Sequence, residues 1–280
     1  MDGFIDTGAV ALLTRAIHNA RREGAETLVI ELDTPGGALD VLGVLQKQLV
    51  DAEDSGLKLS CWVHLHAASA GALVALSCSS IYMHPAGTIG SAHPVTSGPN
   101  GLESLPQEEG AREKVLSFLR SQFASMAERY GRPPSLAEAM VDADVEVYQV
   151  RVDNELRLFD GEQFFVLRDS GKPYELVATI KAKGKILNLT AKQAVEMRLA
   201  DGLASSMEEV LERLDLEPAN VTPMIERSAS DRAVVWIEKL TPLLILAALV
   251  LAYLELKLPG FGVPGILSIA CFTIVLAGKY

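Results

Sequence analysis

The sequence has few basic residues for its length. Its 280 residues include 25 Lys and Arg against 36 Asp and Glu, so the formal net charge is -11 and the pI is near 5.0. No cluster of Lys and Arg interrupts this acidic balance. Binding to nucleic acid requires such a cluster to neutralise phosphate groups, so we expect no nucleic-acid partner.

The sequence also lacks a metal-binding pattern. Its three cysteines, Cys61, Cys78 and Cys271, lie in apolar or small-residue stretches, where cysteine behaves as a small hydrophobe. His64 and His66 share a face of a predicted strand, but no carboxylate or cysteine joins them at the spacing of metal ligands, so we interpret them as structural. No dedicated nucleotide site is visible either, and we expect no cofactor.

The first residues lack the basic stretch and apolar core of a secretory signal, whereas the last residues are strongly apolar. Residues 243–254 are uninterruptedly apolar, and a second apolar run covers 265–277. Each is shorter than the ~20 residues that span a bilayer, but the first lengthens if its helix begins near Ala233. We predict a membrane hairpin over 233–280, after a linker at 215–232. The alternative is a buried hairpin of a soluble protein, although a core helix apolar on all faces is uncommon.

Helical and strand patterns alternate in the first part of the chain. The expected elements are a helix at 9–23, a strand at 27–32, a helix at 39–52, a strand at 59–65, a helix at 69–78 and a strand at 80–84. A Pro/Gly-rich stretch to Gly101 follows, and then helices at 110–130 and 135–140. This alternation predicts an α/β domain over 1–214 with a mostly parallel sheet.

Residues 145–187 have a different pattern, in which apolar and polar residues alternate. Turn signals stand at 152–154, 160–161 and 170–171, so we predict a small antiparallel insertion. Helices are expected again at 190–197 and 206–214, with Thr190 and Ser206 as N-caps.

Ser69 lies among very small residues where a predicted buried strand gives way to a helix. Such a junction exposes the hydroxyl, while the first amides of the helix point at whatever reacts with it. A simpler interpretation is close packing of the helix on the sheet, with Ser69 as an N-cap. The heptad from His66 to Ala72 alone does not decide between them.

A second motif, from Asp33 to Gly37, follows the preceding predicted strand and favours the catalytic interpretation. A proline followed by two glycines suits a tight turn that presents bare backbone amides. Gly36 or Gly37 would supply one donor of an oxyanion hole, and the amide of Ala70 the other. Two such motifs in consecutive strand–helix units are more specific than either one.

These motifs resemble those of the ClpP-class membrane proteases of the NfeD type. The family pattern is a TPGG turn, a serine in ASAG and a PGT-x-IG element, which stand here at 34–37, 68–71 and 85–90, the last interrupted by Ala86. Residues 187–204 resemble the segment that closes the family's protease domain, and 258–265 resemble its membrane hairpin. The family's signal sequence and its β-barrel domain beyond Tyr280 have no counterpart, so we expect that the chain is a fragment.

The resemblance implies a ClpP/crotonase-like fold of repeated β-β-α units and a Ser/Lys dyad. Lys114 occupies the place of the family's base. It lies at the edge of an apolar face formed by Val115, Phe118, Leu119 and Met126, where partial burial would favour its neutral amine. The alternative is an ordinary solvated lysine. His93 is the rival base, because soluble ClpP enzymes use a Ser/His/Asp triad. Alignment on Pro94 places that histidine at Ala92, so we expect His93 to face elsewhere.

The resemblance further implies a serine endopeptidase that cuts an apolar segment of a stomatin-like membrane partner. It also implies an extracytoplasmic protease domain and a homo-oligomer. A binding interpretation is a scaffold on the same fold that pairs with such a partner without cutting it. A third possibility, acyl-CoA chemistry on the related crotonase fold, also uses a glycine turn, but it needs no serine nucleophile.

Overall fold

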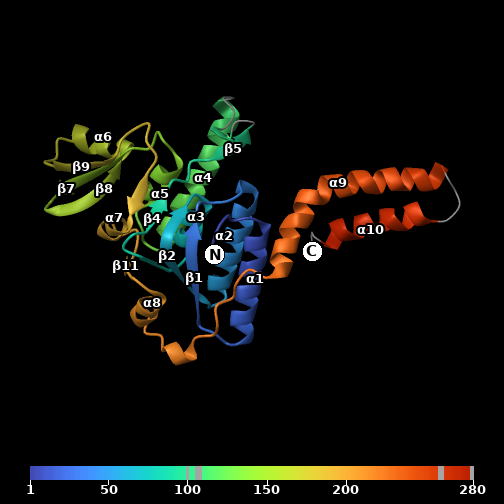
Figure 1. The fold of residues 1–280 in the computed structure, drawn as a ribbon. Helices are drawn as coiled ribbons and strands as arrows, with labels where there is room; N and C mark the ends of the chain where they lie inside the picture. The colour runs from blue at the N-terminus through green and yellow to red at the C-terminus, as the bar shows by residue number, and fades with distance from the viewer. Residues whose placement is uncertain (99–100, 105–108, 258–261, 278–280) are drawn as a thin grey trace. The chain divides into compact units, whose positions relative to one another are not determined.

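The computed structural model describes residues 1–98, 101–104, 109–257 and 262–277 (Figure 1). They form two compact units. One contains Met1–Ile5 and Leu13–Met224, and the other contains Asp6–Leu12 and Ile225–Tyr280. The first residues of helix α1 (Thr7–Arg22) are thus grouped with the C-terminal unit, and the division into a protease domain over 1–214, a linker at 215–232 and a hairpin at 233–280 stays a prediction. Asp6 is tied to that unit by an ion pair with Arg227 at 3.1 Å.

The larger unit is built on a sheet that has six strands among the described residues. The strands are β1 (Thr27–Thr34), β2 (Lys58–Ala68), β3 (Ser80–Met83), β4 (Thr88–Gly90), β10 (Asn188–Thr190) and β11 (Gly202–Leu203). Strand β2 is central, because β1 pairs along one of its edges while β3 and then β4 pair along the other. Every described pair of this sheet is parallel except β10 with β4, so the predicted mostly parallel sheet is confirmed.

Helices follow the strands as the alternation predicted (Figure 1). They are α2 (Leu39–Asp54), α3 (Ala70–Leu76), α4 (Glu109–Arg129) and α5 (Pro134–Val141). Helices α2 and α3 contact β2, α3 contacts α4, and α4 packs along α5. Apolar side chains such as Leu49, Val63, Leu73, Ile81 and Phe123 are almost completely buried in this core.

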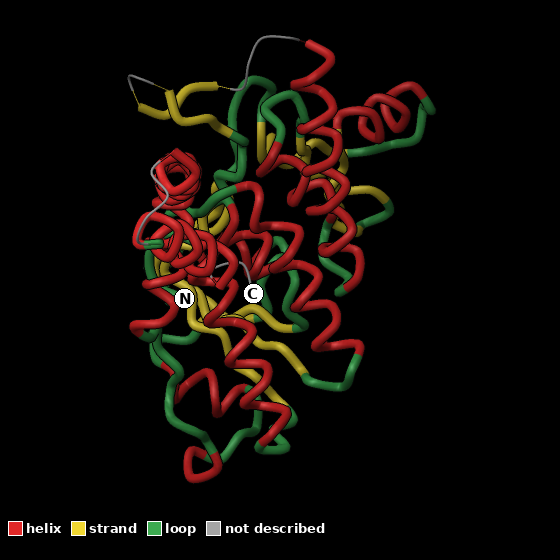
Figure 2. The backbone as a smooth tube through the Cα atoms, turned by 90° about the vertical axis from the view of Figure 1, so that its right-hand side faces the viewer, coloured by secondary structure: helices red, strands yellow, loops and turns green. Residues whose placement is uncertain are grey.

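The Pro/Gly-rich stretch before α4 contains two short strands that the sequence did not predict. Strands β5 (Val95–Gly98) and β6 (Gly101–Ser104) form an antiparallel pair of their own. Figure 2 shows this pair in yellow, separate from the main sheet. The residues between these strands and most of those that lead into α4 lie outside the described part.

The predicted antiparallel insertion is present, with one helix added. Strands β7 (Val147–Val152), β8 (Glu155–Asp160) and β9 (Glu175–Lys181) pair in the order β8-β7-β9. The turn at 153–154 is confirmed, because Asp153 and Asn154 both have positive φ values, as a tight hairpin requires. The hairpin expected at 160–161 was wrong. Asp160 instead forms a capping box with Gln163 and begins helix α6 (Gly161–Asp169).

The chain then returns to the main sheet. Helix α7 (Ala191–Glu196) separates β10 from β11, and α8 (Met207–Arg213) and a short 3-10 turn (Pro218–Asn220) follow. Both predicted N-caps are confirmed, because the side chains of Thr190 and Ser206 accept hydrogen bonds from amides three residues later. Trp62 on β2 packs with Ala204 and with Val210 of α8, so α8 covers part of the sheet face that carries Trp62.

In the C-terminal unit, α9 (Ala229–Lys257) and α10 (Val263–Ala277) lie antiparallel (Figure 1). The Ser268 hydroxyl donates to the Ala248 carbonyl at 2.8 Å, and the Gly265 amide donates to Glu255 at 3.1 Å. Residues Lys239–Lys257 are long and apolar enough to cross a membrane, with a mean hydropathy of 1.9 and only 6% of the span buried. The core helix of a soluble protein is mostly buried, so this span differs from one in its exposure. The expected turn at 258–265 lies partly outside the described residues.

Candidate active site

Ser69 occupies a strained junction between β2 and α3. Its φ of 52° and ψ of -116° place it among the few non-glycine residues with a left-handed backbone. The Ser69 amide donates to the Gly90 carbonyl at 2.9 Å, and its carbonyl accepts from the Ala72 amide at 3.0 Å. Ser69 is the N-cap residue, yet its side chain makes no capping hydrogen bond. The hydroxyl therefore has no capping role, contrary to the simpler interpretation of this serine.

The glycine turn lies directly against Ser69. A Cβ atom built on Gly36, whose φ is 119°, would lie 2.6 Å from the Ser69 Cβ and 3.2 Å from its hydroxyl oxygen. No side chain fits there, because real Cβ atoms essentially never approach another heavy atom this closely. The predicted approach of the turn to the serine is therefore present.

One of the predicted oxyanion donors is already occupied. The Gly36 amide donates to the Thr34 hydroxyl oxygen at 3.0 Å, and this hydroxyl donates to the Gly36 carbonyl at 3.1 Å. The expectation that Gly36 presents a bare amide was therefore wrong, because Thr34 closes the turn on itself. Among the described residues the structure gives no acceptor to the amides of Gly37 and Ala70, and these two amides can still bind an oxyanion.

Lys114 lies in the second turn of α4 and is exposed. The expected partial burial was wrong, because the buried stripe of α4 is formed by Leu116, Leu119 and Phe123, while Phe118 is 61% exposed. The buried stripe shares Leu119 and Met126 with the predicted face, but it is shifted away from Phe118 and Lys114. Within the described part of the chain, Lys114 makes no ion pair and no hydrogen bond.

Two contacts between α4 and α2 nevertheless indicate which part of α2 lies level with Lys114. Gln122 of α4 donates to Gln46 of α2 at 2.8 Å, and Arg129 pairs with Asp54 at 2.5 Å. Both pairs have nearly the same sequence offset, so the two helices run in the same direction. If the same difference in residue number holds toward the N-termini of both helices, Lys114 lies level with Leu39. Leu39 is the first residue of α2 and follows the glycine turn closely.

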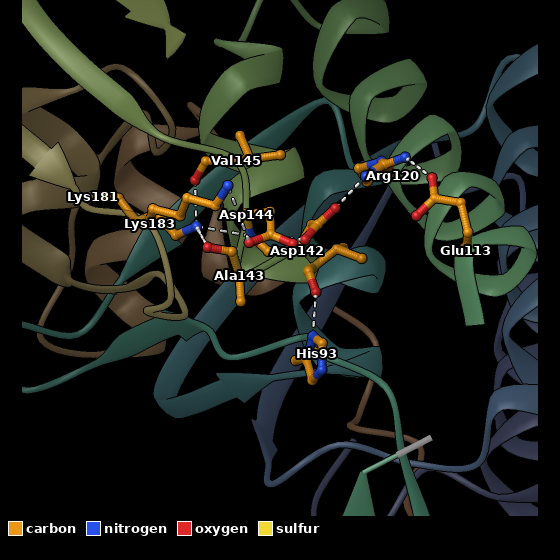
Figure 3. Close-up of polar contacts among 10 residues, drawn as sticks. His93, Glu113, Arg120, Asp142, Ala143, Asp144, Val145, Lys181 and Lys183 are labelled. Carbon is orange, nitrogen blue, oxygen red and sulfur yellow. Dashed lines mark hydrogen bonds and ion pairs between the residues drawn. The ribbon is translucent and has the colours of Figure 1, made fainter. Parts of the chain in front are cut away.

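Arg120, in the middle of α4, connects this helix to Asp142 at the end of α5 (Figure 3). Its guanidinium bonds Glu113 at 2.6 Å and also the carboxylate of Asp142, whose side chain is only 3% exposed. Burial alone would lower the pKa of Arg120, but the hydrogen bonds from Asp142 and Glu113 raise it above its ordinary value. The sequence did not reveal this bridge, because Asp142 lies 22 residues from Arg120 and follows a different helix.

Lys181 is a second lysine near this place, but its contacts do not suit a base. It is almost fully buried, and burial lowers its pKa. Its ammonium donates to the carbonyls of Asp142 at 2.9 Å and Ala143 at 2.6 Å, and also to that of Val145 (Figure 3). Lys181 therefore caps the end of α5, and all three of its protons are used.

The rival base His93 contacts the same helix end. One ring nitrogen, Nδ1, lies 2.9 Å from the Val141 carbonyl (Figure 3). Donation from Nδ1 leaves Nε2 as an acceptor, as a general base requires. The described residues show no contact between His93 and Ser69. His93 remains the alternative that an experiment must separate from Lys114.

His64 and His66 have partners that the sequence did not reveal. His64 lies 3.6 Å from Glu31, and His66 lies 3.0 Å from Asp33, both carboxylates being on the neighbouring strand β1. Among the described residues, no group of three or more His, Cys, Asp or Glu side chains could hold a metal ion. The excess length of β2 over β1 was a signal that some residues there lack a strand partner.

The structure resembles that of a known protease. Two solved forms of the 1510-N membrane-bound stomatin-specific protease match it at 19% identity. A serine-to-alanine variant matches with a TM-score of 0.54, covering 82% of this chain and 91% of that chain. A lysine-to-alanine variant in complex with a substrate peptide matches with a TM-score of 0.57, covering 85% and 94%. The expected ClpP-like α/β fold is thereby confirmed.

Curated relatives are found in bacteria and archaea. The chain is 25% identical over 280 residues to the membrane protein NfeD1b of Bacillus subtilis, covering 98% of this chain and 54% of the relative. It is 30% identical over 139 residues to the membrane-bound protease PH1510 of Pyrococcus horikoshii, covering 48% and 29%. The chain thus spans about half the length of the first relative and less than a third of the second.

Two family models cover most of the chain. The NfeD1b N-terminal domain matches residues 1–163, which is more than half of the sequence, and the NfeD integral membrane domain matches residues 239–280. The second match includes the apolar span of α9, so the unit formed by α9 and α10 is a membrane unit. The chain belongs to the NfeD family of membrane proteins.

Proposed function

We propose that this chain is a membrane-anchored serine endopeptidase in which Ser69 is the nucleophile and Lys114 is the general base. One observation carries the proposal. Ser69 is held in a strained backbone conformation beside a glycine turn, with its hydroxyl unused by the helix cap. Strain of this kind costs of order 1–3 kcal/mol, and it clusters at active sites.

The proposed reaction is acyl transfer. The Ser69 oxygen bonds to the substrate carbonyl carbon while the neutral amine of Lys114 takes its proton. The amides of Gly37 and Ala70 stabilise the oxyanion that forms. Collapse then breaks the peptide C–N bond, with the Lys114 ammonium protonating the leaving amine. A water molecule, deprotonated by the same amine, hydrolyses the acyl-enzyme and releases Ser69.

The similar solved protease supports the proposed roles of a serine and a lysine, and it supports the choice of substrate. The solved protease is described as stomatin-specific, and its lysine-to-alanine variant was captured with a substrate peptide. Its other variant replaces a serine by alanine. Accordingly, the proposed substrate is an apolar segment of a stomatin-like membrane partner, and the active form is proposed to contain two or more copies.

A second candidate function is a scaffold that binds such a partner without cutting it. Two observations favour it: Lys114 is exposed and makes no contact among the described residues, and the Gly36 amide is occupied by Thr34. A catalytic site needs its base within hydrogen-bond reach of the nucleophile when substrate is bound. The scaffold therefore differs from the protease in one measurable property, the reactivity of Ser69.

A fluorophosphonate label tests the proposal. The detergent-solubilised chain should acquire one covalent adduct, which Ser69→Ala abolishes. Ser91→Ala is the matched control, because Ser91 is also a serine with positive φ, at 48°, and it is exposed. Its substitution should leave labelling unchanged. An unreactive parent that still binds a stomatin-like peptide would favour the scaffold, and an adduct on Ser91 would move the nucleophile.

Membrane anchoring is tested by carbonate extraction. The complete chain should stay in the membrane pellet, because Lys239–Lys257 is apolar and mostly exposed, whereas a chain ending at Arg232 should be released. Lys239 and Lys279 flank the hairpin while Lys257 lies near its turn, so charge bias does not favour either orientation. An extracytoplasmic protease domain remains our proposal, and protease protection of sealed vesicles measures it.

A further inference from the structure

Strands β1 and β2 change register just before the site. Leu32 pairs with Val63, but Thr34 pairs with Ala67, so Asp33 alone faces three residues of β2, His64, Leu65 and His66. Such a bulge leaves the extra residues without their strand partners. Backbone amides that lose their strand partners must bind another acceptor or water, and the amide of the exposed His66 finds an acceptor on β1.

Asp33 supplies this acceptor with its side chain. Its Oδ1 atom accepts from the His66 amide at 3.2 Å and lies 3.0 Å from the Nδ1 atom of the same residue. The Asp33 side chain is 30% exposed and that of His66 is 60% exposed. One carboxylate oxygen thus binds both the backbone and the side chain of the last residue of the bulge.

The residues on either side of this contact form the candidate site. Thr34, next to Asp33, closes the glycine turn through its hydroxyl, and Ala67, next to His66, leads by two residues to Ser69. If β1 shifted by one residue against β2, the glycine turn would move by about 3.3 Å relative to Ser69. The approach of Gly36 to Ser69 leaves no room for such a slip.

We infer that Asp33 and His66 are a positioning pair that sets the register between the glycine turn and Ser69. The pair acts through the backbone and touches no reacting atom. Thr34 and Ala67 are buried, and side chains alternate along a strand, so His66 lies on the opposite face from them and is not a base for Ser69. The catalytic importance of the pair depends on the proposed function, but the register itself does not.

Three substitutions of His66 test the inference in the detergent-solubilised chain. His66→Asn places an amide donor near the position of Nδ1, His66→Gln places it one bond further out, and His66→Ala removes it. We expect His66→Ala and His66→Gln to slow fluorophosphonate acylation of Ser69 about tenfold, since complete loss of an oxyanion donor costs about 10²–10³. His66→Asn should restore the rate to within about threefold of the parent.

Amide hydrogen exchange provides a readout that does not need activity. Exchange in peptides covering 34–38 should rise in His66→Ala and return toward the parent in His66→Asn. Equal exchange in all three variants would overturn the inference, and so would an Asn variant as slow in acylation as the Ala variant, because His66 would then act as an imidazole. A parent that is never labelled would refute the proposed hydrolase, while the exchange comparison would still decide the register.

Discussion

The two halves of the candidate site are held together by different forces. The serine half, residues 33–37 and 66–76, is fixed by a strained backbone, buried hydrogen bonds and a glycine in van der Waals contact with Ser69. The base half, residues 109–129 and 134–145, packs through buried apolar side chains of α4 and α5 and adds a bridge of charged groups around Arg120 and Asp142, and its proposed base is exposed. The proposed nucleophile is therefore preorganised, whereas no hydrogen bond or ion pair among the described residues holds the proposed base in place.

The largest effect should come from the serine half. Gly36→Ala places a methyl group 2.6 Å from the Ser69 Cβ in a backbone conformation that alanine avoids, so the turn must move. Since a displacement of 1 Å can cost about 10² in rate, we expect acylation of Ser69 to fall at least about 100-fold.

Gly43→Ala is the matched control for this prediction. Gly43 lies in α2 with open space around its Cβ position, and its substitution should leave labelling intact while stabilising the helix by about 0.5–1 kcal/mol. Comparable loss in both variants would mean that the serine half is less rigid than proposed.

The second prediction concerns the base. Lys114→Arg keeps the positive charge, but an arginine cannot give up its proton to act as a base, so peptide cleavage should be abolished. Lys183→Arg, at another exposed lysine, should cleave normally. If His93→Ala is inactive and Lys114→Ala cleaves normally, a histidine-based mechanism replaces the dyad.

The third prediction tests the charged bridge of the base half. Arg120→Gln leaves the buried carboxylate of Asp142 without its cation, which should lower the free energy of unfolding by about 1–3 kcal/mol. Acylation of Ser69 should fall several-fold, because α4, which carries the proposed base, loses its charged contact with the end of α5. Denaturant unfolding and labelling measure both effects, with the exposed Arg112→Gln as control.

Salt separates the two halves without mutation. At about 1 M salt the screening length falls to about 3 Å, which weakens exposed charge pairs much more than buried backbone contacts. The contact of Arg120 with the exposed Glu113 should weaken more than its pair with the buried Asp142, so acylation in the parent should fall only part of the way toward that of Arg120→Gln, whereas exchange in 34–38 should stay constant. Equal sensitivity of both readouts would contradict the contrast between the halves.

Most of the fold followed from local patterns in the sequence. The alternation of strands and helices, the hairpin at 153–154 and the caps Thr190 and Ser206 depend on neighbouring residues, and all are observed. Helix α6 was missed because Asp160-Gly161 is both a turn signal and a helix start, and Gln163 decided in favour of the cap. Strands β5 and β6 were missed because a Pro/Gly-rich stretch carries no apolar alternation.

The site was predictable only where it is local. Small residues and glycines marked the approach of the turn to Ser69, but the bond from Gly36 to Thr34 depends on a side-chain rotamer that no pattern specifies. The bridges of Arg120 and His66 join residues that are distant in sequence, and a single sequence does not show such pairs. The wrong side was assigned to Lys114 because exposed Phe118 was counted as part of the core.

The smallest effect is expected at Glu138 on α5, where the base half carries an unfavourable charge. Burial raises the pKa of Glu138 above its ordinary value of 4.5, and the nearby Asp160 carboxylate raises it further. The folded chain therefore binds this proton more tightly than the unfolded chain does. The resulting stability is complete below about pH 4.5 and is lost as pH rises through the folded pKa. Glu138→Gln should raise the Tm by about 1–3 °C at pH 7 and change it little at pH 4. The exposed Glu162→Gln should change neither value, and a Tm gain that is equal at both pH values would show that the charge of Glu138 is not its cause.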